Sequence, residues 1–99
     1  MVSTPYTRGR SHEYHALRKL RAEGWFCSRS AASHGPVDIF AGRKGKVLMV
    51  QVKSGTSRAS QQEKELLKLW GAAFHGRVEL WTFKKRKSLE REAIYSEDT

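Results

Sequence analysis

Apolar residues recur at helical spacing near the start of the chain. Ala16, Leu17 and Leu20 fall on one face of a helix, in a pattern that extends over residues 9–23. Gly24 follows directly, and glycine is a residue type that commonly ends helices. The pattern therefore predicts a first helix that stops at this glycine.

Strand-like patterns dominate the middle of the chain. The run 47–52 is apolar on both faces, which is typical of a strand in the centre of a sheet. Glycines and charged residues at 42–45 favour a hairpin turn just before it. The expected strands cover residues 25–29, 37–41, 46–53, 78–83 and 91–95.

A second helix is predicted before the strand at 78–83. Ser60-Gln61-Gln62-Glu63 is a capping-box pattern, in which the serine and the glutamate satisfy backbone N–H groups at a helix start. Gly76 is the expected end of this helix. Its apolar stripe is expected to contain Leu66, Leu67, Trp70, Ala73 and Phe74.

Polar side chains lie where two neighbouring strands are expected to end. Asp38 belongs to the first of them, and thirteen residues later Gln51 closes an apolar run together with Lys53. Residues two apart in a strand share a face, so Gln51 and Lys53 point to the same side as Val47 and Met49. Burial of an amide and an ammonium without partners is costly. We therefore expect both groups to open onto a cleft shared with Asp38.

Glu13 is a charged residue on the buried face of the first predicted helix. It precedes Ala16, Leu17 and Leu20 by three, four and seven residues, so it lies on their stripe. An ordinary surface glutamate would face away from that stripe. The position favours a functional carboxylate.

Together these residues resemble the PD-(D/E)xK nuclease superfamily. Pro36-Val37-Asp38 and Gln51-Val52-Lys53 match the two halves of its motif. Gly9-Arg10-Ser11-His12-Glu13 and Arg29-Ser30-Ala31-Ala32-Ser33 precede them in the order and approximate spacing of archaeal-type Holliday junction resolvases. The resemblance implies an α/β, restriction-endonuclease-like fold with a central mixed β-sheet flanked by helices.

The resemblance also implies a Mg²⁺-dependent endonuclease that cuts four-way DNA junctions as a symmetric homodimer. Mg²⁺ prefers oxygen ligands, Mn²⁺ is expected to substitute for it, and no small-molecule cofactor is expected. Lys53 would orient the attacking water or stabilise the developing negative charge. The expected catalytic residues are Glu13, Asp38, Gln51 and Lys53, and the expected metal ligands are Glu13, Asp38, the Gln51 side-chain oxygen and the Val52 carbonyl.

Two residues depart from the resolvase pattern. Gln51 stands where these enzymes usually carry a glutamate, which removes a negative charge and should weaken metal binding. Tyr14 stands where an arginine commonly follows the helix glutamate, and Arg10 or Arg8 is the candidate to contact phosphate in its place. Three interpretations stay open: a junction resolvase, a PD-(D/E)xK nuclease without junction specificity, and a catalytically impaired DNA-binding module.

A strong excess of basic residues sets the class of partner. The chain has 19 Lys and Arg against 10 Asp and Glu, a formal net charge of +9 in 99 residues, which favours a polyanion such as nucleic acid or an anionic membrane surface. Ser33 either contacts a phosphate, as the resemblance implies, or is a plain loop hydroxyl. The other expected DNA-contacting residues are Arg8, Arg10, Arg29, Arg43, Lys44, Lys46, Arg58, Lys84, Lys85, Arg86 and Lys87.

The length predicts a single nuclease domain over residues 1–99, in which 1–8 form a flexible basic arm. A core of this size is only marginally large enough to stabilise the domain alone. Dimerisation is therefore expected, through apolar surface around Trp70, Phe74 and Trp81. No stretch approaches the roughly 18 apolar residues of a membrane span, and the N-terminus lacks the apolar core of a signal peptide. We expect a soluble cytoplasmic protein without a membrane partner.

Overall fold

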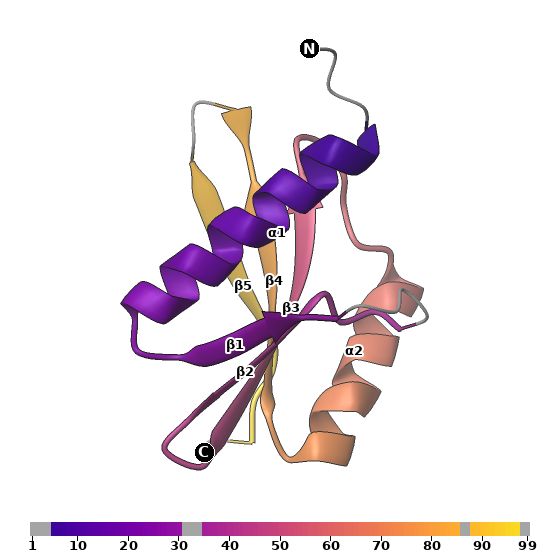
Figure 1. Ribbon diagram of the computed structural model, residues 1–99. Helices are drawn as coiled ribbons and strands as arrows, with labels where there is room; N and C mark the ends of the chain where they lie inside the picture. Colours follow the sequence, from indigo (N-terminus) through magenta and orange to yellow (C-terminus); the bar gives the residue numbers. More distant parts are fainter. Residues whose placement is uncertain (1–4, 31–34, 86–87, 98–99) are drawn as a thin grey trace.

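The structure is a computed structural model that describes residues 5–30, 35–85 and 88–97, with 5–10 described through their backbone only. The described part contains two helices and five strands (Figure 1). In chain order they are α1 (Pro5–Ala22), β1 (Phe26–Arg29), β2 (Ile39–Arg43), β3 (Lys46–Ser54), α2 (Gln61–Phe74), β4 (Arg77–Phe83) and β5 (Leu89–Tyr95).

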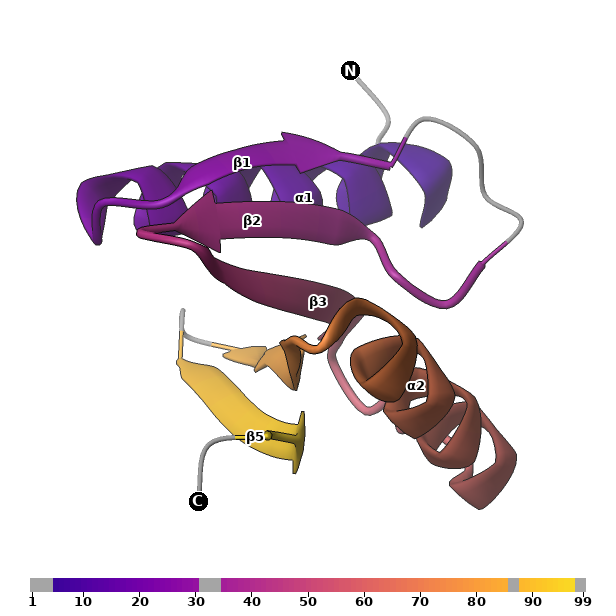
Figure 2. The same ribbon diagram turned by 90° about the horizontal axis from the view of Figure 1, so that it is seen from below.

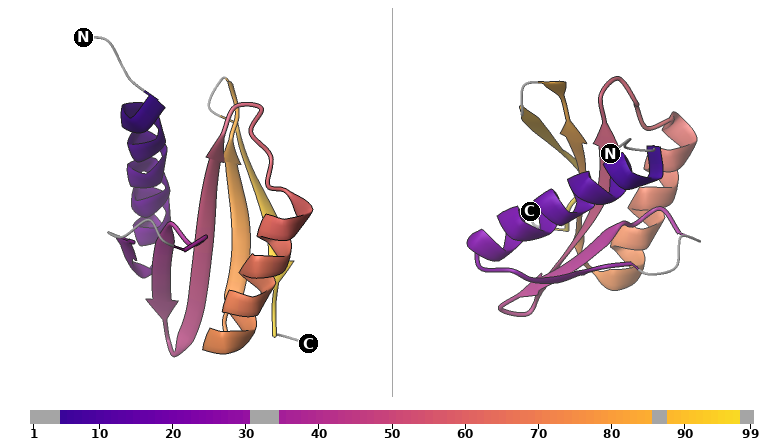
Figure 3. Two further views of the ribbon diagram at one scale, coloured as in Figure 1. Left: turned by 90° about the vertical axis from the view of Figure 1, so that its right-hand side faces the viewer. Right: turned by 45° about the horizontal axis from the view of Figure 1, so that its top comes forward.

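The strands form one mixed sheet in the order β1-β2-β3-β4-β5. β3 and β4 are parallel, whereas the other neighbours are antiparallel. α2 is the crossover that connects the two parallel strands. The left view of Figure 3 shows α1 and α2 on opposite sides of the sheet, and Figure 2 shows α1 lying along β1 and β2. The predicted mixed sheet flanked by helices, with β3 at its centre, is confirmed.

Alternation along β3 divides the core between the two faces of the sheet. Leu48 and Val50 pack with α1, and Met49 packs with α2 on the opposite face. The predicted stripe of α1 is confirmed, because its three apolar residues are almost completely buried. They are Ala16, Leu17 and Leu20.

Trp81 belongs to the core, and its expected place at a dimer interface is wrong. Its side chain is fully buried in the cluster on the α1 side of the sheet. Trp70 packs instead against the cluster on the α2 side. Because β4 alternates, Trp81 points away from the helix that carries Trp70 and Phe74.

The helix ends differ from the sequence predictions in two details. α1 begins at Pro5, so residues 5–8 continue the helix and do not form part of a flexible arm; proline suits a first helical position because its φ is already helical. α2 begins with the predicted capping box. It ends one residue earlier than expected, with His75 as the left-handed cap at φ 50°. No helix in the described ranges is long and apolar enough to cross a membrane.

The buried face of α2 is narrower than its sequence predicts. Leu67 and Gly71 are buried, and Trp70 is half-buried. Leu66 is 44% exposed, and Ala73 is exposed as well. α2 packs against β4 and β5 along the Leu67–Gly71 line, which leaves part of the expected apolar stripe facing outward.

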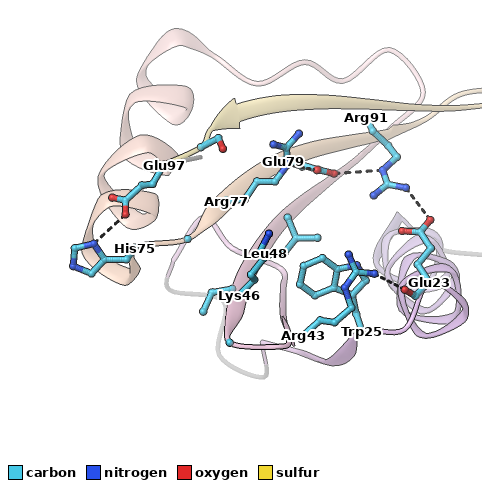
Figure 4. A pocket seen from close by; sticks show the side chains of 14 residues that line it. Glu23, Trp25, Arg43, Lys46, Leu48, His75, Arg77, Glu79, Arg91 and Glu97 are labelled. Carbon is cyan, nitrogen blue, oxygen red and sulfur yellow. Dashed lines mark hydrogen bonds and ion pairs between the residues drawn. The ribbon is translucent and has the colours of Figure 1, made fainter. Parts of the chain in front are cut away.

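A network of charges holds the end of the sheet where β3 and β4 begin. Glu79 is buried and accepts hydrogen bonds from Trp81 Nε1 at 2.8 Å and Arg77 Nε at 2.6 Å. Arg91 reaches both Glu79 at 3.3 Å and Glu23 of the α1–β1 turn at 2.9 Å (Figure 4). Burial raises the pKa of Glu79, but these hydrogen bonds and charges outweigh it and hold that pKa below its ordinary value.

Gly71 allows α2 to lie close to the sheet, and we predict that Gly71→Ala destabilises the fold. A Cβ at this position would collide with the Tyr95 ring and would lie 2.9 Å from Val78 Cγ2. Inside a helix, alanine normally stabilises the fold by about 1 kcal/mol relative to glycine. Overpacking of a core destabilises it by about 1–3 kcal/mol. Urea unfolding should therefore show a net loss of stability. The loss should shrink in a Tyr95→Ala background, and a Gly71→Ala variant more stable than the parent would contradict this packing.

Candidate active site

β3 continues beyond the end of its pairing with β2, and this overhang positions Asp38. The last paired residues are Ile39 and Val50, whereas β3 extends to Ser54. The backbone N–H of Val52 therefore lies beyond β2, and it donates a 2.7 Å hydrogen bond to Asp38 Oδ2. The Asp38 N–H in turn donates to the Val50 carbonyl at 2.9 Å. The two bonds fix the carboxylate at the edge of β3 that β2 leaves uncovered.

Charged neighbours surround Asp38 in this half-buried position. Burial raises the pKa of its carboxyl above the ordinary value, and the negative charge of Glu13 raises it as well. The Val52 N–H and the positive charges of Lys53 and Arg29 act in the opposite direction and lower that pKa without cancelling the rise. Three residues that the sequence singled out, Glu13, Arg29 and Lys53, thus lie within electrostatic reach of Asp38.

Gln51 and Lys53 point toward α2, on the same face as Met49, as the strand alternation predicts. Gln51 Nε2 donates to Glu63 Oε2 at 3.3 Å, and Lys53 Nζ lies 3.0 Å from the same oxygen. Both polar groups therefore find a partner on α2. The sequence pattern indicates Glu63 only as part of a helix cap, and its contact with β3 is a feature that sequence reasoning missed.

Glu13 is held by Arg29 at the other side of Asp38. Arg29 Nε lies 2.8 Å from Glu13 Oε1, and both side chains are 23% exposed. Arg29 Nη1 also donates to the Tyr14 hydroxyl at 3.2 Å. Arg29, which is expected to contact DNA, thus neutralises the helix glutamate in this structure. Tyr14, the departure from the family pattern, helps to hold that arginine.

The oxygen atoms at this edge fit a hard divalent cation through Asp38 and Gln51. Gln51 is 7% exposed, and its Oε1 is buried without a hydrogen-bond partner in the described part of the molecule. A buried acceptor of this kind normally has a partner. Across the described residues no three His, Cys, Asp or Glu side chains converge on a metal position. A cation here would therefore depend on amide and carbonyl oxygens as well as on Asp38.

An open basic groove of about 1000 Å³ lies at the same end of the sheet. It is lined by the loop after β3, by residues of α2, β4 and β5, and by Lys84, Lys85 and Ser88. Its lining includes hydroxyl and basic side chains. The hydroxyl groups belong to Thr56, Ser57, Thr82 and Ser88, and the basic groups belong to Arg58, Lys64, Lys84 and Lys85. Lys64 and Lys84 form ion pairs with Glu92 and Glu90, whereas Arg58 and Lys85 form none within the described residues.

The basic residues of the β2–β3 hairpin lie at the opposite end of β3. Arg43 stacks on the Trp25 ring at 4.3 Å and donates to the Glu23 carbonyl at 2.6 Å. It lines a hollow of about 340 Å³ together with Lys46 (Figure 4). Lys44 is exposed. The structure thus separates these three predicted DNA contacts from the edge that carries Asp38.

Five predicted DNA contacts lie outside the described residues or have undescribed side chains. The residues outside the described ranges are Ser33, Arg86 and Lys87. The residues whose side chains are not described are Arg8 and Arg10.

Comparison with known proteins assigns the chain to a family. The model of the family described as archaeal Holliday junction resolvase (Hjc) matches residues 4–94. The crossover junction endodeoxyribonuclease Hjc of Methanocaldococcus jannaschii is 42% identical over 60 residues, which are 61% of this chain and 44% of that protein. The match thus spans less than half of the relative's length.

A solved structure shares the fold. Hjc of Archaeoglobus fulgidus, a Holliday junction resolvase from an archaeal hyperthermophile, superposes with a TM-score of 0.76 at 23% sequence identity. The superposition covers 88% of this chain and 73% of that one. The likeness confirms the restriction-endonuclease-like α/β fold.

Proposed function

The chain belongs to the archaeal Holliday junction resolvase family, and we propose that it is a metal-dependent endonuclease that cleaves four-way DNA junctions. The observation that carries the proposal is the position of Asp38. Its carboxylate is fixed at the edge of β3 that β2 leaves uncovered. Lys53 and Gln51 lie on either side of Val52 in that strand, and Gln51 Oε1 has no hydrogen-bond partner among the described residues.

The residues at this edge supply the parts that phosphodiester hydrolysis needs. The proposed holders of a Mg²⁺ or Mn²⁺ ion are Glu13, Asp38, Gln51 Oε1 and the Val52 carbonyl. Such an ion, when bound, lowers the pKa of water and offsets the charge of the phosphate. Lys53 is an ammonium held near Asp38, where it orients the water or stabilises the developing negative charge.

The basic groove beside this edge is the proposed path of a DNA arm. Cations and hydroxyl groups contact phosphates without reading the base sequence, and both kinds of side chain line the groove. The net charge of +9 supports the same partner. Junction specificity would then come from the geometry of the arms.

The proposed enzyme acts as a homodimer, because paired cuts need two equivalent sites. An aromatic cluster on the α2 side supports this assembly: the Trp70 and Phe74 rings stack at 5.8 Å, and the Phe40 ring lies 6.0 Å from Phe74. Phe74 is 49% exposed and Leu69 is 67% exposed, so two large apolar side chains of α2 reach the surface.

Two alternatives differ from this proposal in what they do with DNA. A nuclease of the same fold without junction specificity would cut duplex DNA equally well. A DNA-binding module without catalysis is favoured by one observation, the neutral Gln51 in place of the usual glutamate. Metal-dependent nicking of a four-way junction, compared with nicking of a matched duplex, separates all three.

We predict that Asp38→Asn abolishes nicking of a four-way junction in Mg²⁺ or Mn²⁺ while it leaves junction binding nearly intact. The asparagine oxygen can still accept the Val52 hydrogen bond, but the variant has lost the carboxylate charge that would hold the ion. Asp38 does not line the groove, so gel-shift affinity should change little. Unchanged cleavage by the variant would remove Asp38 from the active site.

We predict that the double change Arg58→Ala and Lys85→Ala weakens binding to junction and duplex alike. Both cations line the groove, so the slope of log affinity against log salt should fall by about two units. Lys44→Ala is the matched control, since this exposed lysine lies at the far end of β3. An unchanged slope in the double variant would show that the groove does not hold DNA.

We predict that Phe74→Glu yields a folded monomer that binds junctions poorly and has lost coordinated cutting. A charge on the exposed edge of the aromatic cluster opposes burial between two copies. Phe26→Glu is the control, because this phenylalanine is 86% exposed on β1, away from α2. Sedimentation at micromolar concentration gives the oligomeric state. A dimeric Phe74→Glu variant would place the interface elsewhere.

A further inference from the structure

Glu63 contacts two of the residues that the proposed function uses. Its Oε2 accepts a hydrogen bond from Gln51 Nε2 at 3.3 Å and lies 3.0 Å from Lys53 Nζ. Its Oε1 accepts from the Ser60 N–H at 3.2 Å, and its own N–H donates to Ser60 Oγ at 3.0 Å. The capping box therefore holds the carboxylate rigidly at the start of α2, facing β3.

We propose that Glu63 is a positioning residue that orients the Gln51 amide for cation binding and holds Lys53 beside it. This inference rests on the proposed metal-dependent function and extends it to a residue on α2. It explains how the family site works in this chain with a neutral residue at position 51.

The orientation of the amide carries the first part of the argument. An amide presents an oxygen acceptor on one side and an NH₂ donor on the other. A carboxylate can only accept, so Glu63 selects the orientation in which Gln51 Nε2 faces α2. The amide oxygen then points away from Glu63, and it is this atom that is buried without a hydrogen-bond partner in the described part of the chain. A cation needs that oxygen and is repelled by the NH₂ group.

The charge of Glu63 carries the second part. Glutamine brings no negative charge to position 51, and Glu13 is neutralised by Arg29 at 2.8 Å. Glu63 places a carboxylate directly behind the amide, and its hydrogen bond from Nε2 makes the amide oxygen a better electron donor. Partners behind a metal ligand commonly change metal affinity about 10–100-fold.

A double-mutant experiment tests this role through Mn²⁺ binding, measured by calorimetry on the full chain without DNA. Glu63→Gln should weaken Mn²⁺ binding roughly 10-fold. Glutamine also serves in a capping box, so this change keeps the cap. In a Gln51→Glu background, Glu63 would face a second carboxylate and repel it. The Glu63→Gln substitution removes this repulsion, so it should strengthen Mn²⁺ binding or leave it unchanged.

Two control variants separate positioning from support of the helix. Glu65→Gln removes an exposed carboxylate that pairs with Lys68 on the same helix, and Mn²⁺ affinity should not change. Ser60→Ala weakens the cap and should lower the melting temperature with less effect on Mn²⁺ affinity than Glu63→Gln has. In ¹⁵N NMR without metal, Glu63→Gln should shift the Gln51 side-chain amide signal, because that amide donates to Glu63.

Each outcome has a distinct meaning. Equal Mn²⁺ affinity in Glu63→Gln and the unaltered protein would overturn the role of Glu63 while leaving the proposed function intact. An equal loss in both the Gln51 and the Gln51→Glu background would also overturn it, because the effect would then not pass through the amide. Absence of Mn²⁺ binding by the unaltered protein would overturn the proposed function and this inference together.

Discussion

The stretch of β3 beyond Val50, which pairs with β4 but not with β2, is the constraint on which the candidate site depends. A backbone N–H that is partly shielded from water needs an acceptor, and β2 no longer supplies one at Val52. Asp38 does so, because it directly precedes β2 and reaches the next N–H along β3. The carboxylate is therefore positioned by the backbone of the sheet. A change in the relative lengths of β2 and β3 would move it.

Local sequence patterns were sufficient to predict the parts of the fold that each depend on one element. The apolar run 47–52 identified the central strand, and the Ser60 to Glu63 pattern identified the start of α2. Periodicity alone also placed Glu13 on the buried stripe of α1. It placed the Gln51 side chain on the face of β3 opposite to that of Val50. These predictions need only the spacing of residues within one helix or strand.

The features that could not be predicted all depend on how one element lies against another. Glu63 meets Gln51 only because the crossover places the first turn of α2 beside the end of β3. The ion pair of Arg29 with Glu13 depends on the alignment of β1 with α1. Trp81 carries the same apolar character as Trp70, and only the face of β4 on which it lies assigns it to the core. None of these alignments has a signature in local spacing.

Among the described carboxylates of the candidate site, Glu13 and Glu63 form ion pairs and Asp38 does not. Glu13 is paired with Arg29, and Glu63 is paired with Lys53. Asp38 has no ion pair within the described residues, and burial raises the pKa of its carboxyl. The ionised carboxylate is therefore held in a position that disfavours its own charge. On the neighbouring strand, Gln51 Oε1 is buried without a hydrogen-bond partner among the described residues. Under the proposed function a single divalent cation would satisfy both groups at once. The arrangement that lowers the stability of the metal-free protein would then favour the metal-bound protein.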